Sequence, residues 1–323
     1  MLLVVIEHDR GTMSAASGEA LTFGRTVAST YGMPLHALTI GGAADGLAGS
    51  LAAHGVAVVH QVHSDVLTDY GPEAWGESLA QAVRTLSPAA VIATGTDRGN
   101  EVLAQAAARL DSPFMANALE VLSGDNSWEL MRVRWGGSLL EKASLTSEVK
   151  LLTIAHHAVN ESPADVAGAA TPSPLMVSLD ASLSRSVVSN RIERAAGVTL
   201  ATAPVVVSGG RGVGSPEAFA PLMELAGVLG GVVGCSRAVT NNGWRPHTDQ
   251  VGQTGTRIAP DIYIACGISG AIQHWVGAMA SKKILAINTD KEANMVVKSD
   301  YAVIGDLHKV VPAITAEIQR RRG

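Results

Sequence analysis

The sequence predicts an α/β protein of two domains, each built on a parallel β-sheet. Short runs rich in β-branched residues alternate with longer segments of helical periodicity, which is typical of βαβ units. The alternation stops near Trp128 and starts again near Ala203. The length of 323 residues also suits two domains of about 100–200 residues each. We expect an N-terminal α/β domain over residues 1–190 and a C-terminal doubly wound domain over residues 191–323.

The first half shows four apolar runs separated by three helical patterns. Continuous apolar runs are typical of parallel strands, because helices cover both faces of a parallel sheet. The expected strands are residues 2–7, 35–40, 56–62 and 89–94, and the expected helices are residues 16–31, 42–54 and 73–86.

The pattern is different between residues 128 and 194. Two extended runs, 130–135 and 149–156, are separated by glycines and polar residues, and we interpret them as an antiparallel addition to the first sheet. Residues 160–174 are rich in Pro, Ala, Ser and Asp, which predicts a loop or linker. We interpret residues 182–194 as a connecting segment.

A second alternating unit begins with the apolar run after Pro204. The expected strands are residues 205–208, 232–236, 262–266, 283–287 and 301–304, and the expected helices are residues 217–229, 270–279 and 307–320.

Composition argues against a nucleic-acid partner and against a membrane span. The formal net charge is -5, and aromatic residues make up 4% of the chain. Nucleic-acid binding needs clustered Lys and Arg, and single strands are held by aromatic stacking. The longest apolar stretch, 218–235, is interrupted by Pro221 and Glu224 and does not predict a transmembrane helix.

Cysteine use and the N-terminus indicate the compartment. Cys235 and Cys266 form no CxxC pair, which favours a reducing environment. We interpret Cys266 as a buried strand residue and not as a redox thiol. Residues 2–6 have no basic region before them and no cleavage site after them, so they predict a strand and not a signal peptide. We therefore expect a cytoplasmic protein.

The segment 262–274 has the pattern of a phosphate-binding corner. An apolar strand is followed by Gly267, a turn of small residues and a helical pattern from Gly270. Such a turn offers backbone N–H groups to an anion, although a strand–turn–helix corner without a ligand has the same pattern. A P-loop is excluded because Ser215 stands where lysine is required, and the nucleophile elbow and dinucleotide fingerprint are also incomplete.

Several segments, in a fixed order, resemble electron transfer flavoprotein alpha subunits. Residues 267–274 (Gly-Ile-Ser-Gly-Ala-Ile-Gln-His), together with 284–288 and 306–312, are similar to the C-terminal signature of that family. The resemblance is close from residue 205 to about 318, where residues 207–212, 236–237 and 250–255 are similar to other FAD-contacting segments. The first half resembles the family in layout and in fragments such as residues 5–8.

This resemblance implies a fold and a cofactor. The N-terminal domain would be similar to adenine nucleotide hydrolases, with antiparallel additions, and would dock a partner. The C-terminal domain would bind FAD: Ser269–Ile272 would hold the pyrophosphate, and Thr254, Arg237 and His274 would lie near the flavin. Asn288 and Asp306 would bind the adenosine part. The complete implied set is Arg211, Ser236, Arg237, Gln250, Val251, Gly252, Gln253, Thr254, Gly267, Ser269, Gly270, Ala271, Ile272, Gln273, His274, Asn288, Asp306 and Leu307.

The resemblance also implies a function. The chain would carry FAD as one half of a heterodimer with a beta subunit. It would accept electrons from flavin dehydrogenases, such as the acyl-CoA dehydrogenases of fatty acid β-oxidation, and pass them to a downstream oxidoreductase, for which a membrane quinone reductase is one candidate. It would be an electron carrier and not an enzyme. The alternative is a stand-alone nucleotide-binding or sensor protein that uses the first sheet.

Other candidate residues carry less information. His60 with His63, and the pair His156-His157, offer only two ligands each, so we expect no metal site. Residues 97–101 follow the fourth strand and could form a nucleotide site or a helix cap, of which the cap is favoured. Family members commonly have an acid where this chain has residues 240–242 (Thr-Asn-Asn), a difference that affects the expected flavin environment and not the expected cofactor.

Overall fold

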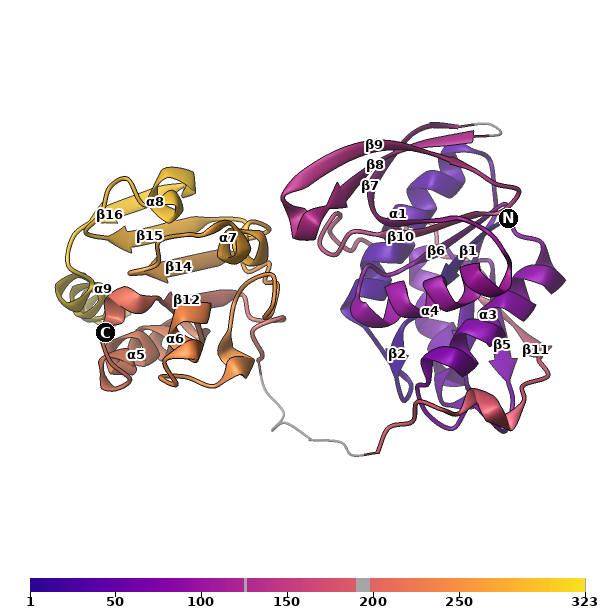
Figure 1. Ribbon diagram of the computed structural model, residues 1–323, viewed down its shortest axis with the longest axis horizontal. Helices are drawn as coiled ribbons and strands as arrows, with labels where there is room; N and C mark the ends of the chain where they lie inside the picture. Colours follow the sequence, from indigo (N-terminus) through magenta and orange to yellow (C-terminus); the bar gives the residue numbers. More distant parts are fainter. Residues whose placement is uncertain (125–126, 190–197, 323) are drawn as a thin grey trace. The chain divides into compact units, whose positions relative to one another are not determined.

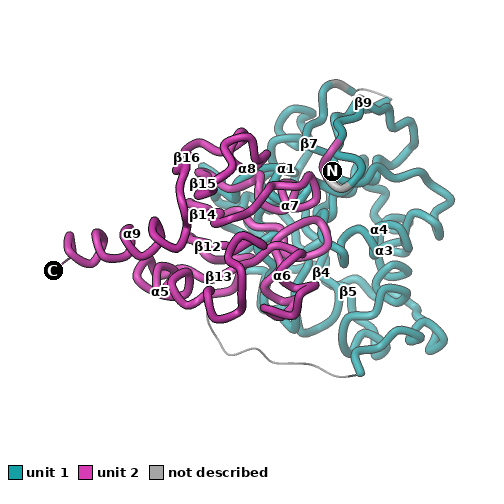
Figure 2. The backbone as a smooth tube through the Cα atoms, turned by 60° about the vertical axis from the view of Figure 1, so that its left-hand side comes forward, with its two compact units in different colours: residues 1–135, 139–192 teal, residues 136–138, 193–323 magenta. Residues whose placement is uncertain are grey.

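The chain folds into two compact α/β units. The computed structural model describes residues 1–124, 127–189 and 198–322. Unit 1 comprises residues 1–135 and 139–192, and unit 2 comprises residues 136–138 and 193–323 (Figure 2). Each unit is built on its own sheet, which confirms the predicted fold class. The expected boundary between residues 190 and 191 lies outside the described residues.

Unit 1 is organised around a nine-stranded sheet with the order β11-β5-β4-β1-β6-β10-β7-β8-β9 (Figure 1). Neighbours from β11 to β7 pair in parallel, while β8 is antiparallel to both β7 and β9. The strands are β1 (Leu2–Val5), β4 (Leu35–Ile40), β5 (Val58–His63), β6 (Ala90–Ala93), β7 (Phe114–Gly124), β8 (Ser127–Arg134), β9 (Leu139–Thr146), β10 (Lys150–Ile154) and β11 (Thr171–Met176); β2 (His8–Asp9) and β3 (Thr12–Met13) form a separate hairpin.

Helices cover both faces of this sheet because successive strand residues point in opposite directions. Leu2 and Val4 of β1 pack in one cluster with α1 (Ala15–Thr30) and α2 (Ala48–Leu51). Leu3 and Val5 pack in the other cluster with α3 (Pro72–Leu86) and α4 (Asp97–Arg109). Both α1 and α4 begin with a side-chain cap: Ser14 accepts from the Ala16 amide, and Thr96 accepts from the Gly99 amide.

Two expectations for unit 1 are wrong in part. Residues 130–134 of the expected run 130–135 lie in the antiparallel β8, but β10 is parallel to both β6 and β7. All five residues of β10 are buried, which is typical of an interior parallel strand. Residues 160–170 are irregular, but β11 follows and forms the sheet edge, where its Pro172 and Pro174 are tolerated. The start of α4 at residues 97–101 agrees with the favoured helix cap, but its length was not predicted, and the strands β7 and β9 were not expected.

The segment expected to connect the two domains is described only in its first part. The 3₁₀ helix η4 (Ala181–Leu183) lies at its start. Residues 190–194 of the segment lie outside the described residues.

Unit 2 has a five-stranded parallel sheet with the order β13-β12-β14-β15-β16. Its strands, β12 (Val205–Gly209), β13 (Val232–Cys235), β14 (Ile262–Cys266), β15 (Ile284–Asn288) and β16 (Tyr301–Ile304), follow the predicted order. The short helices α6 (Arg237–Asn241) and α8 (Asn294–Lys298) were not expected, whereas α5 (Ala220–Leu229), α7 (Ile272–Ala278) and α9 (Leu307–Arg322) were.

The sheet of unit 2 is covered on both faces, which confirms the doubly wound arrangement. Val207 and Ile264 pack with residues of α5 and α9 in one core cluster. Val206 and Tyr263 pack with residues of α7 and α8 in the other. Among the described residues, no helix is both long and apolar enough to cross a membrane.

Candidate functional site

The order of the strands in unit 2 places a crevice between β12 and β14. From β12 the sheet grows through β13 on one side and through β14, β15 and β16 on the other. In open parallel sheets, ligands bind beyond the carboxyl ends of the strands at such a switch point. The loops that follow β12 and β14 both begin at this point. They belong to two of the segments that the sequence indicated as FAD-contacting.

Glycines join these two loops without intervening side chains. Gly210 donates its amide to the Cys266 carbonyl at 2.8 Å, and Gly212 donates to the Gly267 carbonyl at 3.1 Å. A Cβ on Gly210 would lie 2.2 Å from the Gly267 oxygen, and one on Gly212 would lie 2.9 Å from the Gly267 Cα. Gly267 itself has a φ of +63°, which disfavours other residues. The floor of the crevice is therefore backbone packed on backbone.

The loop after β14 presents unused amides above this floor. Within the described part of the chain, the N–H groups of Ser269, Gly270 and Ala271 have no protein acceptor. Gly270 has a φ of +77°, and a Cβ there would lie 2.4 Å from the Met295 amide nitrogen. Neighbouring free amides of this kind form an anion-binding concavity.

The helix after this loop is shorter than the sequence indicates. It begins at Ile272 and not at Gly270, and it has seven residues. A helix of this length contributes little dipole, so the loop amides are the main anion donors. Ile272 and Gln273 are exposed at the first turn.

The end of β13 adds a hydroxyl and a cation. Ser236 precedes α6, yet its side chain does not cap that helix, and its buried Oγ has no hydrogen-bond partner among the described residues. Arg237 begins α6 and is exposed, as is Arg211 in the loop after β12. Neither arginine forms an ion pair within the described part of the chain. Both charges are available to an anionic ligand.

A chain of hydrogen bonds holds the loop that contains Gln250. The Gln250 Nε2 donates to the Thr254 Oγ1 at 3.0 Å, and its Oε1 accepts from the Thr240 hydroxyl at 2.9 Å. Gln250 is buried while Thr254 is exposed, so the Thr254 hydroxyl is fixed at the surface with its proton still available. Thr240 stands where relatives commonly have an acid, and here it orients Gln250.

The rest of this loop lies along α7. Val251 is buried in the core, and its amide donates to the Cys235 carbonyl. The Gln253 amide donates to the Gln273 carbonyl at 2.7 Å, and a Cβ on Gly252 would lie 3.1 Å from the same oxygen. The exposed Gln253 side chain remains for a ligand, whereas Val251 and Gly252 position the backbone.

His274 is buried and bound to Tyr263, an interaction that the sequence did not indicate. The Tyr263 hydroxyl lies 2.7 Å from the His274 Nε2. Burial lowers the pKa of His274 to about 4, with the Val251 backbone acting in the opposite direction. The ring is therefore neutral at physiological pH, and its buried Nδ1 has no partner of good hydrogen-bond geometry among the described residues.

The three last site residues have structural contacts of their own. Asn288 donates from Nδ2 to the Ile268 carbonyl at 3.1 Å and accepts from the Asp290 amide. The Asp306 carboxylate accepts from the His308 amide at the start of α9. Leu307 is buried in the core, so only its main chain could face a ligand.

These residues fit an FAD molecule. The diphosphate of a dinucleotide needs amide donors, a backbone surface that it can approach closely, and cationic side chains. The crevice offers all three. Among the described residues, the buried Ser236 Oγ has no hydrogen-bond partner, and the buried His274 Nδ1 has none of good geometry. Cys266 supplies none of this chemistry, because burial raises the pKa of its thiol to about 12.

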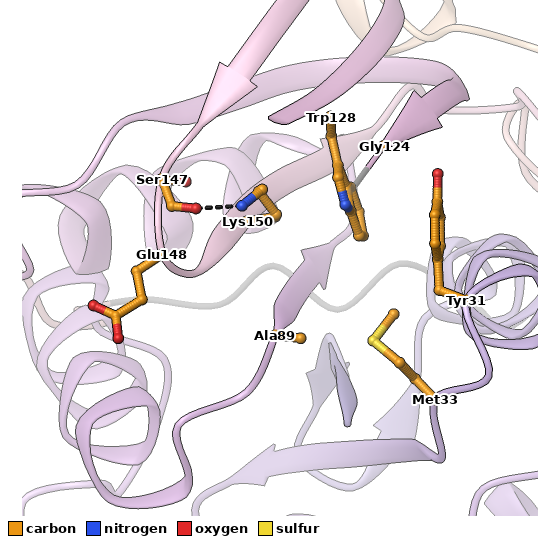
Figure 3. Close-up of a pocket in the computed structure, with 8 residues that line it drawn as sticks. All are labelled: Tyr31, Met33, Ala89, Gly124, Trp128, Ser147, Glu148 and Lys150. Carbon is orange, nitrogen blue, oxygen red and sulfur yellow. Dashed lines mark hydrogen bonds between the residues drawn. The ribbon is translucent and has the colours of Figure 1, made fainter. Parts of the chain in front are cut away.

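Unit 1 contains a cavity of about 460 Å³ with a different character (Figure 3). Tyr31 and Trp128 stack on one side of it, and Lys150 points toward Ser147 on the other. None of the lining residues belongs to the implied FAD set: they are Tyr31, Met33, Ala89, Gly124, Trp128, Ser147, Glu148 and Lys150.

The switch point of the first sheet, between β1 and β6, is also unsuited to a phosphate. The Glu7 carboxylate accepts hydrogen bonds from the Thr94 and Thr96 hydroxyls there. Arg98 lies over the Tyr70 ring at 4.7 Å, and Thr96 caps the following helix. Residues 97–101 thus begin a capped helix, as the favoured interpretation expected, and the acid beside them would repel an anion.

Comparison with known proteins gives a consistent result. Residues 199–279 match the family model described as the electron transfer flavoprotein FAD-binding domain, and residues 2–180 match the electron transfer flavoprotein domain. The electron transfer flavoprotein subunit alpha of Mycobacterium leprae is 35% identical over 99% of both chains. That of Mycobacterium tuberculosis H37Rv is 36% identical over 100% of this chain and 99% of the relative, and that of Bacillus subtilis is 34% identical over 99% and 97%. The chain therefore belongs to the electron transfer flavoprotein alpha subunit family.

Proposed function

We propose that this protein is the FAD-carrying alpha subunit of a heterodimeric electron transfer flavoprotein. The observation that carries the proposal is the glycine-floored crevice at the carboxyl ends of β12 and β14, with the three free amides of Ser269, Gly270 and Ala271 above it. The role that we propose for the chain is electron transport, as a carrier without a chemical substrate of its own.

The diphosphate and adenosine parts would be held by different groups. The three amides would donate to the pyrophosphate, and the Arg211 guanidinium would balance part of its charge. The exposed Asp306 carboxylate and the remaining hydrogen-bonding capacity of the Asn288 amide are suited to ribose hydroxyls and adenine.

The flavin part would meet the side chains at the ends of β13 and α7. When bound, FAD supplies the redox chemistry, and the protein tunes it by charge and hydrogen bonding. Arg237 would place a permanent positive charge nearby, and the Thr254 and Ser236 hydroxyls would donate. If the Tyr263 hydroxyl donates to the His274 Nε2, the Nδ1 carries the proton and is a neutral donor.

The partners that we propose are those expected for a member of this family. A beta subunit would complete the heterodimer, with the N-terminal domain as its docking platform. Flavin dehydrogenases such as acyl-CoA dehydrogenases would supply electrons, and a downstream oxidoreductase would receive them. The stand-alone nucleotide-binding protein is disfavoured, because Glu7 occupies the corresponding crevice of the first sheet.

The cofactor released from the purified heterodimer is expected to be FAD and not FMN. Only a dinucleotide flavin uses both the three loop amides and the adenosine-binding residues Asn288 and Asp306. Chromatography of the flavin after heat denaturation identifies it. An intact heterodimer that releases FMN, or no flavin, would contradict the proposal.

Replacing Arg237 by Ala is expected to lower the reduction potential of the bound flavin. The loss of one nearby positive charge destabilises the reduced, more negative cofactor. The reduction potential should therefore fall by an amount on the order of tens of millivolts in a partly solvated site. Reductive titration of wild type and variant measures the shift. Arg320→Ala is the matched control, since Arg320 is a surface arginine paired with Glu317. Equal potentials for all three proteins would assign Arg237 a docking or structural role.

The chain is expected to form a one-to-one complex with its beta subunit and to be poorly loaded with FAD when alone. A partner that binds only the folded state stabilises it by mass action, so the melting temperature should rise as beta subunit is added. Size-exclusion chromatography with light scattering gives the stoichiometry. A fully flavinylated homodimer that ignores the beta subunit would favour the stand-alone alternative.

A further inference from the structure

Two histidines and a glutamate meet in unit 1, away from the residues assigned to FAD. Glu19 lies in the second turn of α1, and His156 and His157 follow directly after β10 and Ala155 (Figure 1). One ligand atom of each residue lies within 4.8 Å of those of the other two. The sequence shows no third ligand near the His156-His157 pair, so no metal site was expected there. The fold supplies Glu19, which is 138 residues from His157 in the sequence.

The Glu19 carboxylate faces both rings. Its Oε1 lies 3.0 Å from the His157 Nδ1, and its Oε2 lies 3.5 Å from the His156 Nδ1. The His157 amide also donates to Oε2, at 2.8 Å. The two imidazoles are stacked with centroids 3.7 Å apart and planes inclined by 28°. The helix and the turn therefore bring three potential ligand atoms close together.

The two carboxylate-to-imidazole distances are close to the edge length of a tetrahedral coordination polyhedron. Ligand atoms about 2.1 Å from a tetrahedral ion lie about 3.4 Å from one another. The two carboxylate-to-imidazole distances of 3.0 and 3.5 Å lie on either side of that value. The side chains of Glu19, His156 and His157 are 11%, 24% and 16% exposed, so open coordination positions could be filled by water.

A simple ion pair leaves this cluster incomplete. The His156 Nδ1 lies 3.5 Å from the carboxylate and is buried without a hydrogen-bond partner in the described part of the chain. The His157 Nδ1 is bonded to Glu19, whereas the other ring nitrogen of His157, Nε2, is also buried without a partner among the described residues. A cation bound between the carboxylate and the two rings would give the His156 Nδ1 a partner.

The backbone at the two histidines adopts a turn that includes an unfavourable φ angle. His156 and His157 are the central residues of a turn closed by the Ala158 amide and the Ala155 carbonyl, at 3.0 Å. His157 has a φ of +61°, in the left-handed region that non-glycine residues usually avoid. Strained positions of this kind persist where the surroundings over-determine them, and they gather at functional sites.

We propose that Glu19, His156 and His157 form a binding site for a divalent first-row transition-metal ion such as Zn²⁺. Two imidazoles and one carboxylate suit these ions, whereas Mg²⁺ and Ca²⁺ prefer sets of oxygen ligands. The ion would join α1 to the turn after β10, so its binding would stabilise unit 1.

The chain offers a matched control for this cluster. His63 and Asp45 form a histidine–carboxylate pair at 2.9 Å, of the same chemistry but with side chains 30% and 46% exposed. Among the described residues, this pair does not belong to any cluster of three potential metal ligands. His63→Asn therefore removes a comparable pair without touching the proposed site.

The test is calorimetric titration of ZnCl₂ into the untagged, full-length protein after treatment with a chelator. We expect one strong site per chain in wild type and in His63→Asn, and binding weakened by about 10–100-fold or more in Glu19→Gln and His156→Gln. At a hundredfold excess over Kd, Zn²⁺ should raise the melting temperature of wild type by about 5 °C and leave the two site variants nearly unchanged. MgCl₂ should give no such site.

Circular dichroism separates loss of binding from loss of folding. If Glu19→Gln does not fold, the His156→Gln variant decides, because His156 makes fewer contacts than Glu19 in the cluster. Absence of a strong Zn²⁺ site in folded wild type, or equal affinity in wild type and His156→Gln, would overturn the proposal.

Discussion

The contact between the loops after β12 and β14 is the constraint on which the rest of the site depends. Gly210 and Gly212 bind the carbonyls of Cys266 and Gly267, and any Cβ at these positions would collide with backbone. With the two loops locked together, the amides of the segment that follows cannot turn inward to find protein acceptors. They stay available at the mouth of the crevice, where the strand order of the sheet already places a ligand.

Much of the fold was predictable because each strand and helix carries its own periodic signal. The strands of unit 2 were found nearly residue for residue, since short buried β-branched runs are distinctive there. Pairing was harder to predict. The buried run of β10 gives no information about strand direction. Its neighbour β6 is distant in the sequence, and its neighbour β7 was not predicted. In β11, prolines suggested a loop, although a sheet edge tolerates them.

The site was predictable in its backbone and less so in its side chains. Glycines and other small residues indicate a strand–turn–helix corner by their identity alone. Their spacing does not show which neighbouring side chains are buried in the core and which face a ligand. His274 binds Tyr263, Gln250 bridges Thr240 and Thr254, and Leu307 lies in the core; these are tertiary contacts without a local signature. The cluster of Glu19 with two histidines escaped detection for the same reason, because one of its ligands comes from another element.

The central claim is that the backbone of the β14–α7 loop binds the diphosphate of FAD. A crystal structure of the heterodimer with its flavin measures this directly. The account predicts diphosphate oxygens at hydrogen-bonding distance, about 2.7–3.2 Å, from the amide nitrogens of Ser269, Gly270 and Ala271. A diphosphate located elsewhere in the chain, such as beside Glu7 in unit 1, with those three amides bound only to water, would contradict it.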